Sequence, residues 1–484
     1  MAEKKRIVVG GWFDLPRLGT EAWSTLVRRQ GVVYDKSTGF KFDAATDVRG
    51  AVGTLRSAGV EVELTLRCFV CVPGNTLIIG DNKQIRNSKP MDRSAGVSGL
   101  STIARTFSRP YKGKLLRVKA NGLLPIEITP EHPVLVSTST TSRTGKKRVQ
   151  KIEFSELQWK EAGALSLKKE GSEGDYLFIP RVPGSNQDTH VSLQEFTNEN
   201  GRRVCISKRL PLELPLNSDT AWLVGVYIAE GFPSNTCACF SLNHDEEEIH
   251  QRIMEIGKTS GYSPSKYRKA TSTIVVIPSR ILSRALSSWC GKGARNKMIP
   301  DFLLFHKNPN ILRSLLNGYA AGDGYSSGGV TFMSTSSKVL ALQIQLLGAR
   351  LGEFISVSWA KSGSSVIDGR RITGGPEGKY VLELRPRSKQ SFARVTDLGI
   401  LTPIRDIESL HFSGKVYNVE TADNTYLVSN AVVHNCGKEA CPGCPYLSSC
   451  DRAGVSSFCL CADHAPEKSV FEEYTRAFDA NLKV

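Results

Sequence analysis

The pattern of apolar and polar positions divides the chain into β-type and helical stretches. The apolar run at residues 77–79 and the alternating stretch at 417–428 favour β-strands. The segments 223–231 and 316–324 are instead typical of helices, because small residues recur four positions apart on one face. No apolar run is long enough for a membrane span, and residues 7–13 are too few for a signal peptide. We therefore expect a cytoplasmic protein.

The first 70 residues follow an order of elements that suggests no known family. Their pattern predicts a strand, a helix, a hairpin, a second helix and a second strand. These elements are expected at residues 6–9, 21–29, 32–42, 46–57 and 60–66, in that order. Ser37-Thr38-Gly39 marks the turn of the hairpin.

An internal repeat occupies the middle of the chain. The two helical segments match at a constant offset of 93 residues, which aligns Glu230 with Asp323. The triplets 240–242 and 332–334 also correspond, and each precedes a helical run. A chain of 484 residues is too long for one domain, so we expect several cores, one of them a duplicated fold.

Each copy of the repeat ends on an acid. Small residues four apart, such as Gly225 and Ala229, let the two helix backbones approach closely, and the second copy has the same spacing. Glu230 and Asp323 would then end side by side. Hard oxygen ligands of this kind bind Mg²⁺, which activates water and stabilises a leaving oxygen on phosphorus. The alternative is that both acids merely sit near helix ends in water.

Two distant points of the chain carry residues that could excise what lies between them. The Cys71 thiol can attack the carbonyl of Val70 and form a thioester, which a second thiol at Cys436 can take over. Asn435 can cyclise onto its own backbone carbonyl and cut the bond that follows it. His434 is placed to donate a proton to the leaving amine. Rearrangement of the thioester to an amide would then join Val70 to Cys436.

Five blocks of sequence contain or surround these residues in a fixed order. Ordinary β-structure would explain any one of these blocks, but it would not explain all five together. They are Cys71-Val72-Pro73-Gly74-Asn75-Thr76, Thr129-Pro130-Glu131-His132-Pro133-Val134-Leu135, Val416-Tyr417-Asn418-Val419-Glu420, Asn424-Thr425-Tyr426-Leu427-Val428 and Ala431-Val432-Val433-His434-Asn435-Cys436. Together with the two helical motifs, they give residues 71–435 a sequence that resembles an intein. In such a protein a Hint-fold splicing element is interrupted by a LAGLIDADG homing endonuclease.

The resemblance implies roles for further residues. Thr129 and His132 would polarise the first scissile carbonyl and protonate its leaving nitrogen. Asn418 stands where many relatives carry an aspartate that assists the first two steps, which bears on the rate of splicing rather than on its occurrence. Lys297, in Lys297-Met298-Ile299-Pro300, resembles a lysine block of the nuclease and would stabilise the charged phosphate. A solvated surface lysine is the alternative.

The resemblance implies a multidomain chain. An all-β Hint domain would contain an inserted, duplicated α+β endonuclease, and a small α+β metal-binding host would be split around the insert. The expected divisions are 1–70 for the first host segment, 71–200 and 396–435 for the two Hint parts, 201–395 for the endonuclease, and 436–484 for the second, cysteine-rich host segment. Residues 363–378 are rich in glycine and serine and are expected to form an exposed loop.

The charge is concentrated in the insert. Residues 71–435 carry +15 of the net +16, as suits a protein that gains affinity for DNA by releasing counterions. Double-stranded DNA is the expected partner, and the insert is expected to be a monomer with a pseudo-two-fold nuclease. The basic stretches 266–269 and 385–389 are candidate DNA contacts, although either one alone could be a solvated run.

The cysteines point to metal rather than disulfides, because a cytoplasmic protein keeps its thiols reduced. Ligation would join the host into 119 residues that hold seven of the 12 cysteines. The candidate ligands are Cys68, Cys436, Cys441, Cys444, Cys450, Cys459, Cys461 and His464. Paired thiolates favour Zn²⁺, while an iron–sulfur cluster and reduced cysteines without metal are the alternatives.

We therefore expect protein splicing, which needs no cofactor, together with Mg²⁺-dependent, site-specific cleavage of double-stranded DNA. One alternative is a splicing element whose nuclease has decayed, and the intact Glu230 and Asp323 speak against it. The other alternative is that the chain is mainly a metal-binding host module.

Overall fold

The computed structural model describes most of residues 71–435 and parts of the first 66 residues. The parts near the start are 5–9, 12–13, 20–35, 39–41, 48–58 and 62–66. The short gaps after residue 71 are 145–148, 168–172, 200–201, 204–210, 362, 368–369, 374–376, 387 and 389–391. Residues 436–484 are outside the described part. None of the described helices is both long and apolar enough to cross a membrane.

The described elements of the first 66 residues follow the predicted order. Strand β1 (Lys5–Val9) pairs in parallel with β5 (Val62–Leu66). Between them lie α1 (Thr20–Ser24), which continues as a π-helical turn at Thr25–Arg29, and α2 (Val48–Ser57). The predicted hairpin is formed by β3 (Val33–Asp35) and β4 (Gly39–Lys41), with β2 (Trp12–Phe13) on the other side of β4. The predicted order of elements is confirmed for the described residues, β2 was not predicted, and residues 36–38 of the predicted turn lie outside the described part.

A β-rich domain is built from residues 71–180 and 394–435, which lie on either side of a long insertion in the sequence. Its main sheet has the strand order β11-β10-β31-β15-β12-β33-β32. The strands are β10 (Gly99–Ala120), β11 (Ile126–Ile128), β12 (Pro133–Thr144), β15 (Gly174–Pro180), β31 (Gly399–Thr421), β32 (Thr425–Val428) and β33 (Ala431–His434). Strands from the two segments alternate in this sheet, so neither segment could form it alone.

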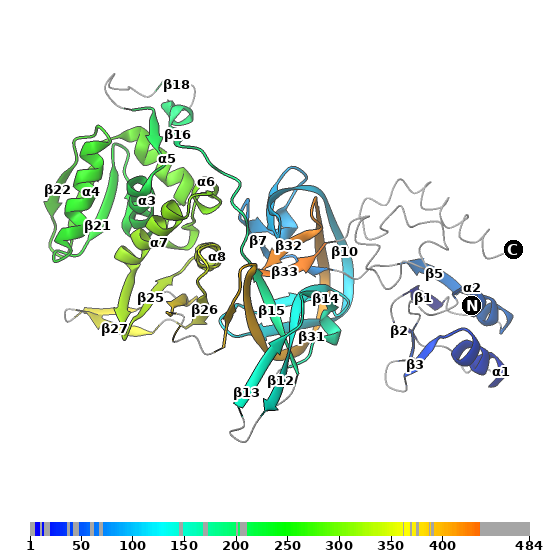
Figure 1. Cartoon of the computed structure of the whole chain (residues 1–484). Helices are drawn as coiled ribbons and strands as arrows, with labels where there is room; N and C mark the ends of the chain where they lie inside the picture. The colour runs from blue at the N-terminus through cyan, green and yellow to red at the C-terminus, as the bar shows by residue number, and fades with distance from the viewer. Residues whose placement is uncertain are drawn as a thin grey trace.

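The two segments are joined by long antiparallel pairing. β10 pairs with β31 from Ile103 and Thr421 at one end to Ala120 and Ile404 at the other. β6 (Val72–Pro73), which directly follows Cys71, pairs with the same strand β31. Buried valine, isoleucine and leucine side chains of both segments share one apolar core. Figure 1 shows this domain in the middle of the molecule, with cyan and orange strands side by side.

An α+β domain, residues 186–385, contains two copies of one arrangement of helices and strands. The first copy consists of α3 (Ser218–Glu230), β20 (Gly231–Pro233), β21 (Ala238–Leu242), α4 (Glu247–Thr259), β22 (Ser265–Arg268), β23 (Thr273–Ile277) and α5 (Arg280–Cys290). The second consists of α7 (Pro309–Asp323), β24 (Gly324–Ser327), β25 (Val330–Thr335), α8 (Lys338–Arg350), β26 (Ile355–Ala360) and β29 (Lys379–Leu384). Both four-stranded sheets have the same order, β20-β21-β23-β22 and β24-β25-β29-β26. The sequence repeat is therefore a structural duplication.

Helices α3 and α7 pack through their glycines. A Cβ atom added to Gly225 would lie 2.3 Å from the Leu315 carbonyl oxygen. One added to Gly318 would lie 2.2 Å from the carbonyl oxygen of Trp222. Real side chains do not approach a backbone oxygen so closely, so only glycine allows this contact. The predicted close approach of the two motif helices is confirmed.

Two expectations about the insertion need correction. The change from one domain to the other lies nearer residue 180 than 200, because β16 (His190–Ser192) pairs with β19 (Glu213–Pro215) and Leu193 packs into the core of the α+β domain. The segment expected as a loop at residues 363–378 contains a hairpin of β27 (Ser364–Ile367) and β28 (Arg370–Thr373). The glycine and serine residues of this segment are typical of turns, but such a composition does not exclude two short strands.

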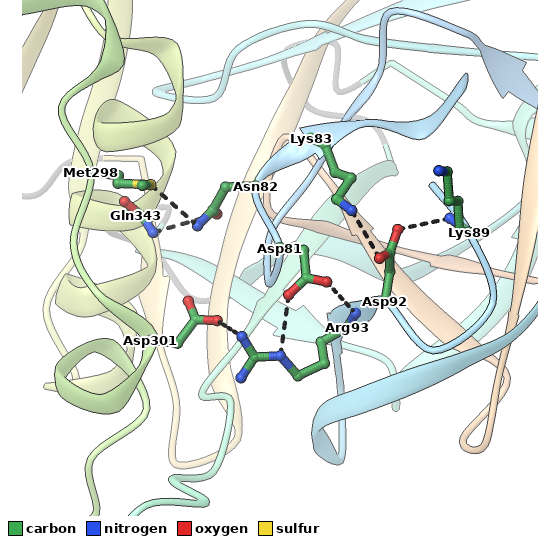
Figure 2. A network of polar contacts seen from close by, with 9 residues as sticks. All are labelled: Asp81, Asn82, Lys83, Lys89, Asp92, Arg93, Met298, Asp301 and Gln343. Carbon is green, nitrogen blue, oxygen red and sulfur yellow. Dashed lines mark hydrogen bonds and ion pairs between the residues drawn. The ribbon is translucent and has the colours of Figure 1, made fainter. Parts of the chain in front are cut away.

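Polar contacts connect the two domains (Figure 2). Arg93 of the β-rich domain donates from Nη2 to Asp301 Oδ2 across the interface at 2.8 Å and from Nε to Asp81 Oδ1 at 3.1 Å within its own domain. Gln343 of α8 donates to the Asn82 side chain at 3.4 Å and to the Ile299 carbonyl at 2.9 Å. Apolar side chains of both domains also belong to one continuous core. The interface therefore fixes α8 and the segment before α6 (Asp301–Leu304) against the β-rich domain.

We expect Gly318→Ala to destabilise the α+β domain by about 1–3 kcal/mol, the usual cost of overpacking. The added methyl group would meet the Trp222 backbone, which cannot rotate away. Gly363→Ala is the matched control, because an added Cβ there has no atom within 4 Å. Thermal unfolding of the two variants measures the difference, and equal losses of stability would contradict the glycine-mediated contact.

Candidate functional site

The first cluster of candidate residues surrounds the backbone of Cys71. A turn between β11 and β12 holds Thr129 and His132, and the His132 N–H donates to the Thr129 carbonyl at 3.0 Å. The Cys71 N–H donates to Thr129 Oγ1 at 3.1 Å. The Cys71 carbonyl oxygen accepts from the Thr129 N–H at 3.1 Å and lies 3.2 Å from His132 Nδ1. All three residues are buried.

His132 is neutral in this environment. Burial lowers its pKa to about 4, the hydrogen bond with the Cys71 carbonyl opposes the shift, and the neighbouring charge of His434 adds to it. A neutral imidazole carries one proton, and the carbonyl contact requires it on Nδ1. Nε2 is then free of its proton and is buried without a hydrogen-bond partner among the described residues.

The second cluster surrounds Asn435, which follows β33. His434 Nδ1 lies 2.7 Å from the Asn435 carbonyl oxygen, which belongs to the second bond that splicing is expected to cut. The Asn435 N–H donates to the Asn424 carbonyl at 2.8 Å. Its side-chain Nδ2 donates to Thr421, to the hydroxyl at 2.9 Å and to the carbonyl at 3.3 Å. Burial lowers the pKa of His434, so it too is neutral at pH 7 and donates from Nδ1.

The two clusters are neighbours. β33 pairs with β12 through Val433 and Val134, so His434 and Asn435 lie close to the turn that carries His132. The lowering of the His132 pKa by His434 reflects the same proximity. Cys71 and Asn435, at opposite ends of a 365-residue stretch, thus flank one buried histidine.

The contacts differ in detail from the expected roles. Thr129 contacts the Cys71 nitrogen, which belongs to the first bond expected to be cut, whereas His132 contacts the carbonyl of Cys71 itself. His434 lies on the carbonyl of the second bond rather than on its nitrogen. Asn418 is buried in β31, where its Oδ1 accepts from the Val419 N–H at 2.7 Å. Val70, Cys68 and Cys436 are outside the described residues.

Two residues of this site, Trp159 and Thr421, were not predicted from the sequence. The Trp159 ring lies against the His434 ring, with centroids 4.9 Å apart in an edge-to-face arrangement. Thr421 holds the Asn435 amide. Neither residue belongs to a recognisable motif, and both contact their partners across a sheet. The only signal in the sequence concerned Thr421, a threonine at a buried position of a strand in which polar and apolar residues alternate.

The third cluster lies where α3 and α7 end. Burial raises the pKa of Glu230 to about 7, and the charges of Asp323 and Glu246 raise it further while Lys297 opposes them. Burial also raises the pKa of Asp323 to about 6, against the hydrogen bond from Tyr319 and the charge of Lys297. A Cβ added to Gly322 would lie 3.0 Å from Glu230 Cγ, so the first acid packs on the helix that carries the second.

Lys297 is not a solvated surface lysine. It is 8% exposed, and its Nζ donates to the carbonyls of Tyr227 at 2.7 Å and Gly231 at 2.8 Å, at the end of α3. Burial lowers its pKa, while Cys290 and the two acids oppose the shift. The structure therefore brings Lys297 to the same place as Glu230 and Asp323.

Two carboxylates at neighbouring helix ends, with Glu230 half-buried and Asp323 exposed, fit a magnesium ion that keeps several waters. Mg²⁺ usually binds one or two carboxylates and keeps several waters, so it needs no larger set of protein ligands. In the part of the chain that the structure describes, no group of three or more His, Cys, Asp or Glu side chains could hold a metal. The candidate host ligands Cys436, Cys441, Cys444, Cys450, Cys459, Cys461 and His464, like Cys68, lie outside that part. Zinc or an iron–sulfur cluster in the host stays a prediction.

The chain is similar to proteins whose names describe different functions. No model of a known protein family matches the chain. It is 29% identical over 386 residues to an ATP-dependent DNA helicase, Hel308, of Thermococcus kodakarensis, which covers 69% of this chain and 33% of the helicase. It is 25% identical over 397 residues to an iron–sulfur cluster assembly SufBD family protein of Mycobacterium tuberculosis, covering 76% and 43%. The chain thus spans between a third and a half of the length of these relatives.

Among solved structures, the chain is similar to the homing endonuclease I-DmoI in complex with DNA and Mn. The identity is 11%, the TM-score is 0.25, and the match covers 35% of this chain and 90% of that one.

We expect Glu230→Gln to stabilise the metal-free protein at pH 8 but not below pH 4.5. The pKa of Glu230 is raised in the folded state, so the folded protein loses stability as the pH rises from about 4.5 through 7 and the carboxyl group ionises. Removing the charge should raise the unfolding temperature at pH 8 by about 2 °C or more.

Glu248→Gln on the exposed side of α4 is the matched control. Thermal unfolding in EDTA between pH 4 and 8 measures the effect, and a gain that does not change with pH would contradict it. Adding Mg²⁺ at pH 8 should stabilise the parent protein more than Glu230→Gln.

Proposed function

We propose that residues 71–435 excise themselves and join Val70 to Cys436. The observation that carries the proposal is the convergence of Cys71 and Asn435 on the buried His132. A stretch that cuts itself out must bring its two ends to one place. These ends are brought together by a sheet that uses strands from both segments.

The first step forms a thioester. The Cys71 sulfur bonds to the Val70 carbonyl carbon, the peptide bond between the two residues breaks, and the Cys71 nitrogen takes up a proton. Thr129 Oγ1 contacts that nitrogen and holds its orientation. His132 and the Thr129 N–H hold the other end of Cys71 through its carbonyl, so the residue cannot turn away from the bond. The Cys436 thiol then takes over the acyl group and releases the Cys71 thiol.

The last cut is made by Asn435. Its Nδ2 bonds to its own carbonyl carbon, the bond to Cys436 breaks, and a succinimide remains at the end of the excised protein. A proton leaves Nδ2 and another reaches the nitrogen of Cys436. The His434 Nδ1–H contacts the carbonyl oxygen where negative charge develops, which stabilises the transition state. The Val70 acyl group then moves from the Cys436 sulfur to its nitrogen.

The similar proteins support an insert rather than a shared host. A DNA helicase and an iron–sulfur assembly protein have no evident activity in common, yet each resembles 69–76% of this chain. Residues 71–435 make up 365 of the 484 residues, which is close to that share. A self-excising element carried by different hosts would produce this pattern.

We expect Asn435→Ala to abolish ligation while leaving the first step possible, because only an amide side chain can cyclise. Intact-mass measurement of the parent should find a 119-residue ligated host and a 365-residue excised protein. In Asn435→Ala, residues 71–435 should stay attached to 436–484. Asn317→Ala, on the exposed side of α7, is the control and should splice normally. Ligated host in Asn435→Ala would refute the proposed role.

We further propose that the excised protein cuts double-stranded DNA. The specific observation is that Glu230 and Asp323 converge at the ends of two packed helices beside the buried Lys297. Glu230 and Asp323 would hold Mg²⁺, which when bound supplies an activated water and stabilises the leaving oxygen of a phosphodiester. Lys297 keeps its cationic end near the two acids and offsets their charge.

The surface of the α+β domain suits a DNA partner. Strand β22 lies at the edge of its sheet, and all four of its residues are exposed. It carries Lys266, Tyr267 and Arg268, which could contact phosphates and bases. Each basic stretch has one paired cation, since Lys266 of β22 pairs with Glu247 and Arg385 of the second stretch pairs with Glu383. The net charge of residues 71–435 favours the same partner.

We expect Glu230→Gln and Asp323→Asn each to abolish Mg²⁺-dependent cleavage of a DNA that encodes residues 1–70 joined directly to 436–484. Binding to this DNA should change less than threefold, because the substitutions leave the exposed basic residues intact. Glu248→Gln is the control for both measurements. Splicing should proceed in all three variants, and normal cleavage by either acid variant would contradict the shared metal site.

A further inference from the structure

Thr421 makes a contact that the splicing chemistry described above does not use. It is the last residue of β31 and is 2% exposed. The Asn435 side-chain nitrogen donates to the Thr421 hydroxyl at 2.9 Å and to the Thr421 carbonyl at 3.3 Å. This nitrogen is the atom that would attack the Asn435 carbonyl.

The direction of these hydrogen bonds is fixed by the groups involved. A backbone carbonyl can only accept, so the side chain of Asn435 must turn its NH₂ group, not its oxygen, towards Thr421. The Thr421 hydroxyl has acceptors of its own in the Thr425 carbonyl at 2.8 Å and the Asp423 carboxylate at 3.2 Å. Its single proton is therefore directed to that turn, and a lone pair faces Asn435.

Within the described part of the chain, Thr421 is the residue that hydrogen-bonds the Asn435 side chain. Its Oδ1 is buried and has no hydrogen-bond partner among the described residues. If the Thr421 hydroxyl were absent, only the longer contact with the Thr421 carbonyl would distinguish the nitrogen from the oxygen. The amide could then rotate and present its oxygen to the scissile carbonyl, which is an unproductive arrangement.

The hydroxyl itself is held rigidly. The turn from Thr421 to Thr425 is closed by Asp423, which accepts from the Thr425 N–H at 3.2 Å and from the Thr425 hydroxyl at 2.9 Å. Asp423 also accepts from the Ser98 N–H at 3.0 Å, which ties the turn to the neighbouring segment. Such a fixed acceptor can hold a reacting group in place without moving during the reaction.

We propose that Thr421 is a positioning residue for the cut between Asn435 and Cys436, and that its hydroxyl selects the reactive orientation of the Asn435 amide. This inference rests on the proposed splicing function. Thr421 neither donates nor receives a proton in the reaction. It reduces the share of molecules in which the amide oxygen, rather than the nitrogen, faces the scissile carbonyl.

The test compares Thr421→Val, which removes the hydroxyl but keeps the shape, with Thr421→Ser, which keeps the hydroxyl. Both are made in the full chain with Cys71→Ala, where only the second cut can occur, and the release of residues 436–484 is followed over time. We expect valine to slow the cut by about tenfold to a hundredfold, the usual effect of misplacing a reacting group, and serine to stay within about threefold of the parent. Thr402→Val, at another buried hydroxyl of β31, is the matched control.

Two further measurements separate positioning from a structural defect. With Cys71 present, thiol-induced cleavage at Val70 reports the first step, which Thr421→Val should leave unchanged. The pH profile of the second cut should keep its shape, because His434 is untouched. The inference is overturned if valine cuts as fast as the parent, if serine is as slow as valine, or if both steps slow together. Failure of the Cys71→Ala parent to cut at all would instead overturn the proposed splicing function, and this inference with it.

Discussion

The antiparallel pairing of β33 with β12 is the contact on which the proposed reaction depends. It joins Val433 to Val134 and so brings the last residues of a 365-residue stretch beside the turn that holds its first residue. The pairing is short, but β33 is also held by β32, and the long β10–β31 pairing fixes the rest of the sheet. Since each segment supplies strands that the other needs, the site forms only when both have folded.

The same sheet explains how a second domain can sit inside the first. Pro180, where the chain leaves the sheet, pairs with Gly399, where β31 begins, so the two ends of the insertion are neighbours. A domain whose ends lie close together can be inserted there without opening the sheet. The Arg93–Asp301 ion pair and the contacts of Gln343 then fix the inserted domain against its carrier. The proposed metal site is thereby held against the β-rich domain although its helices belong to a separate duplication.

The sequence predicted best what depends on local patterns. Glycine spacing and the acids at the helix ends gave the α3–α7 contact, because both are properties of single helices. The boundary near residue 180 and the β27–β28 hairpin depend on strand pairing between distant residues, which composition does not encode. The burial of Lys297 follows from two backbone carbonyls some 70 positions earlier, and the roles of Thr421 and Trp159 follow from contacts across the sheet. A motif indicated Lys297 but not its burial, and no motif indicated Thr421 or Trp159.

The most direct test of the central claim is the peptide sequence at the new junction. Tryptic digestion of the expressed protein, followed by tandem mass spectrometry, should give a peptide in which Cys68-Phe69-Val70 is followed at once by Cys436-Gly437-Lys438. An amide between Val70 and Cys436 can arise only by excision of residues 71–435 with ligation. If Val70 is followed only by Cys71, and Asn435 only by Cys436, the chain does not splice.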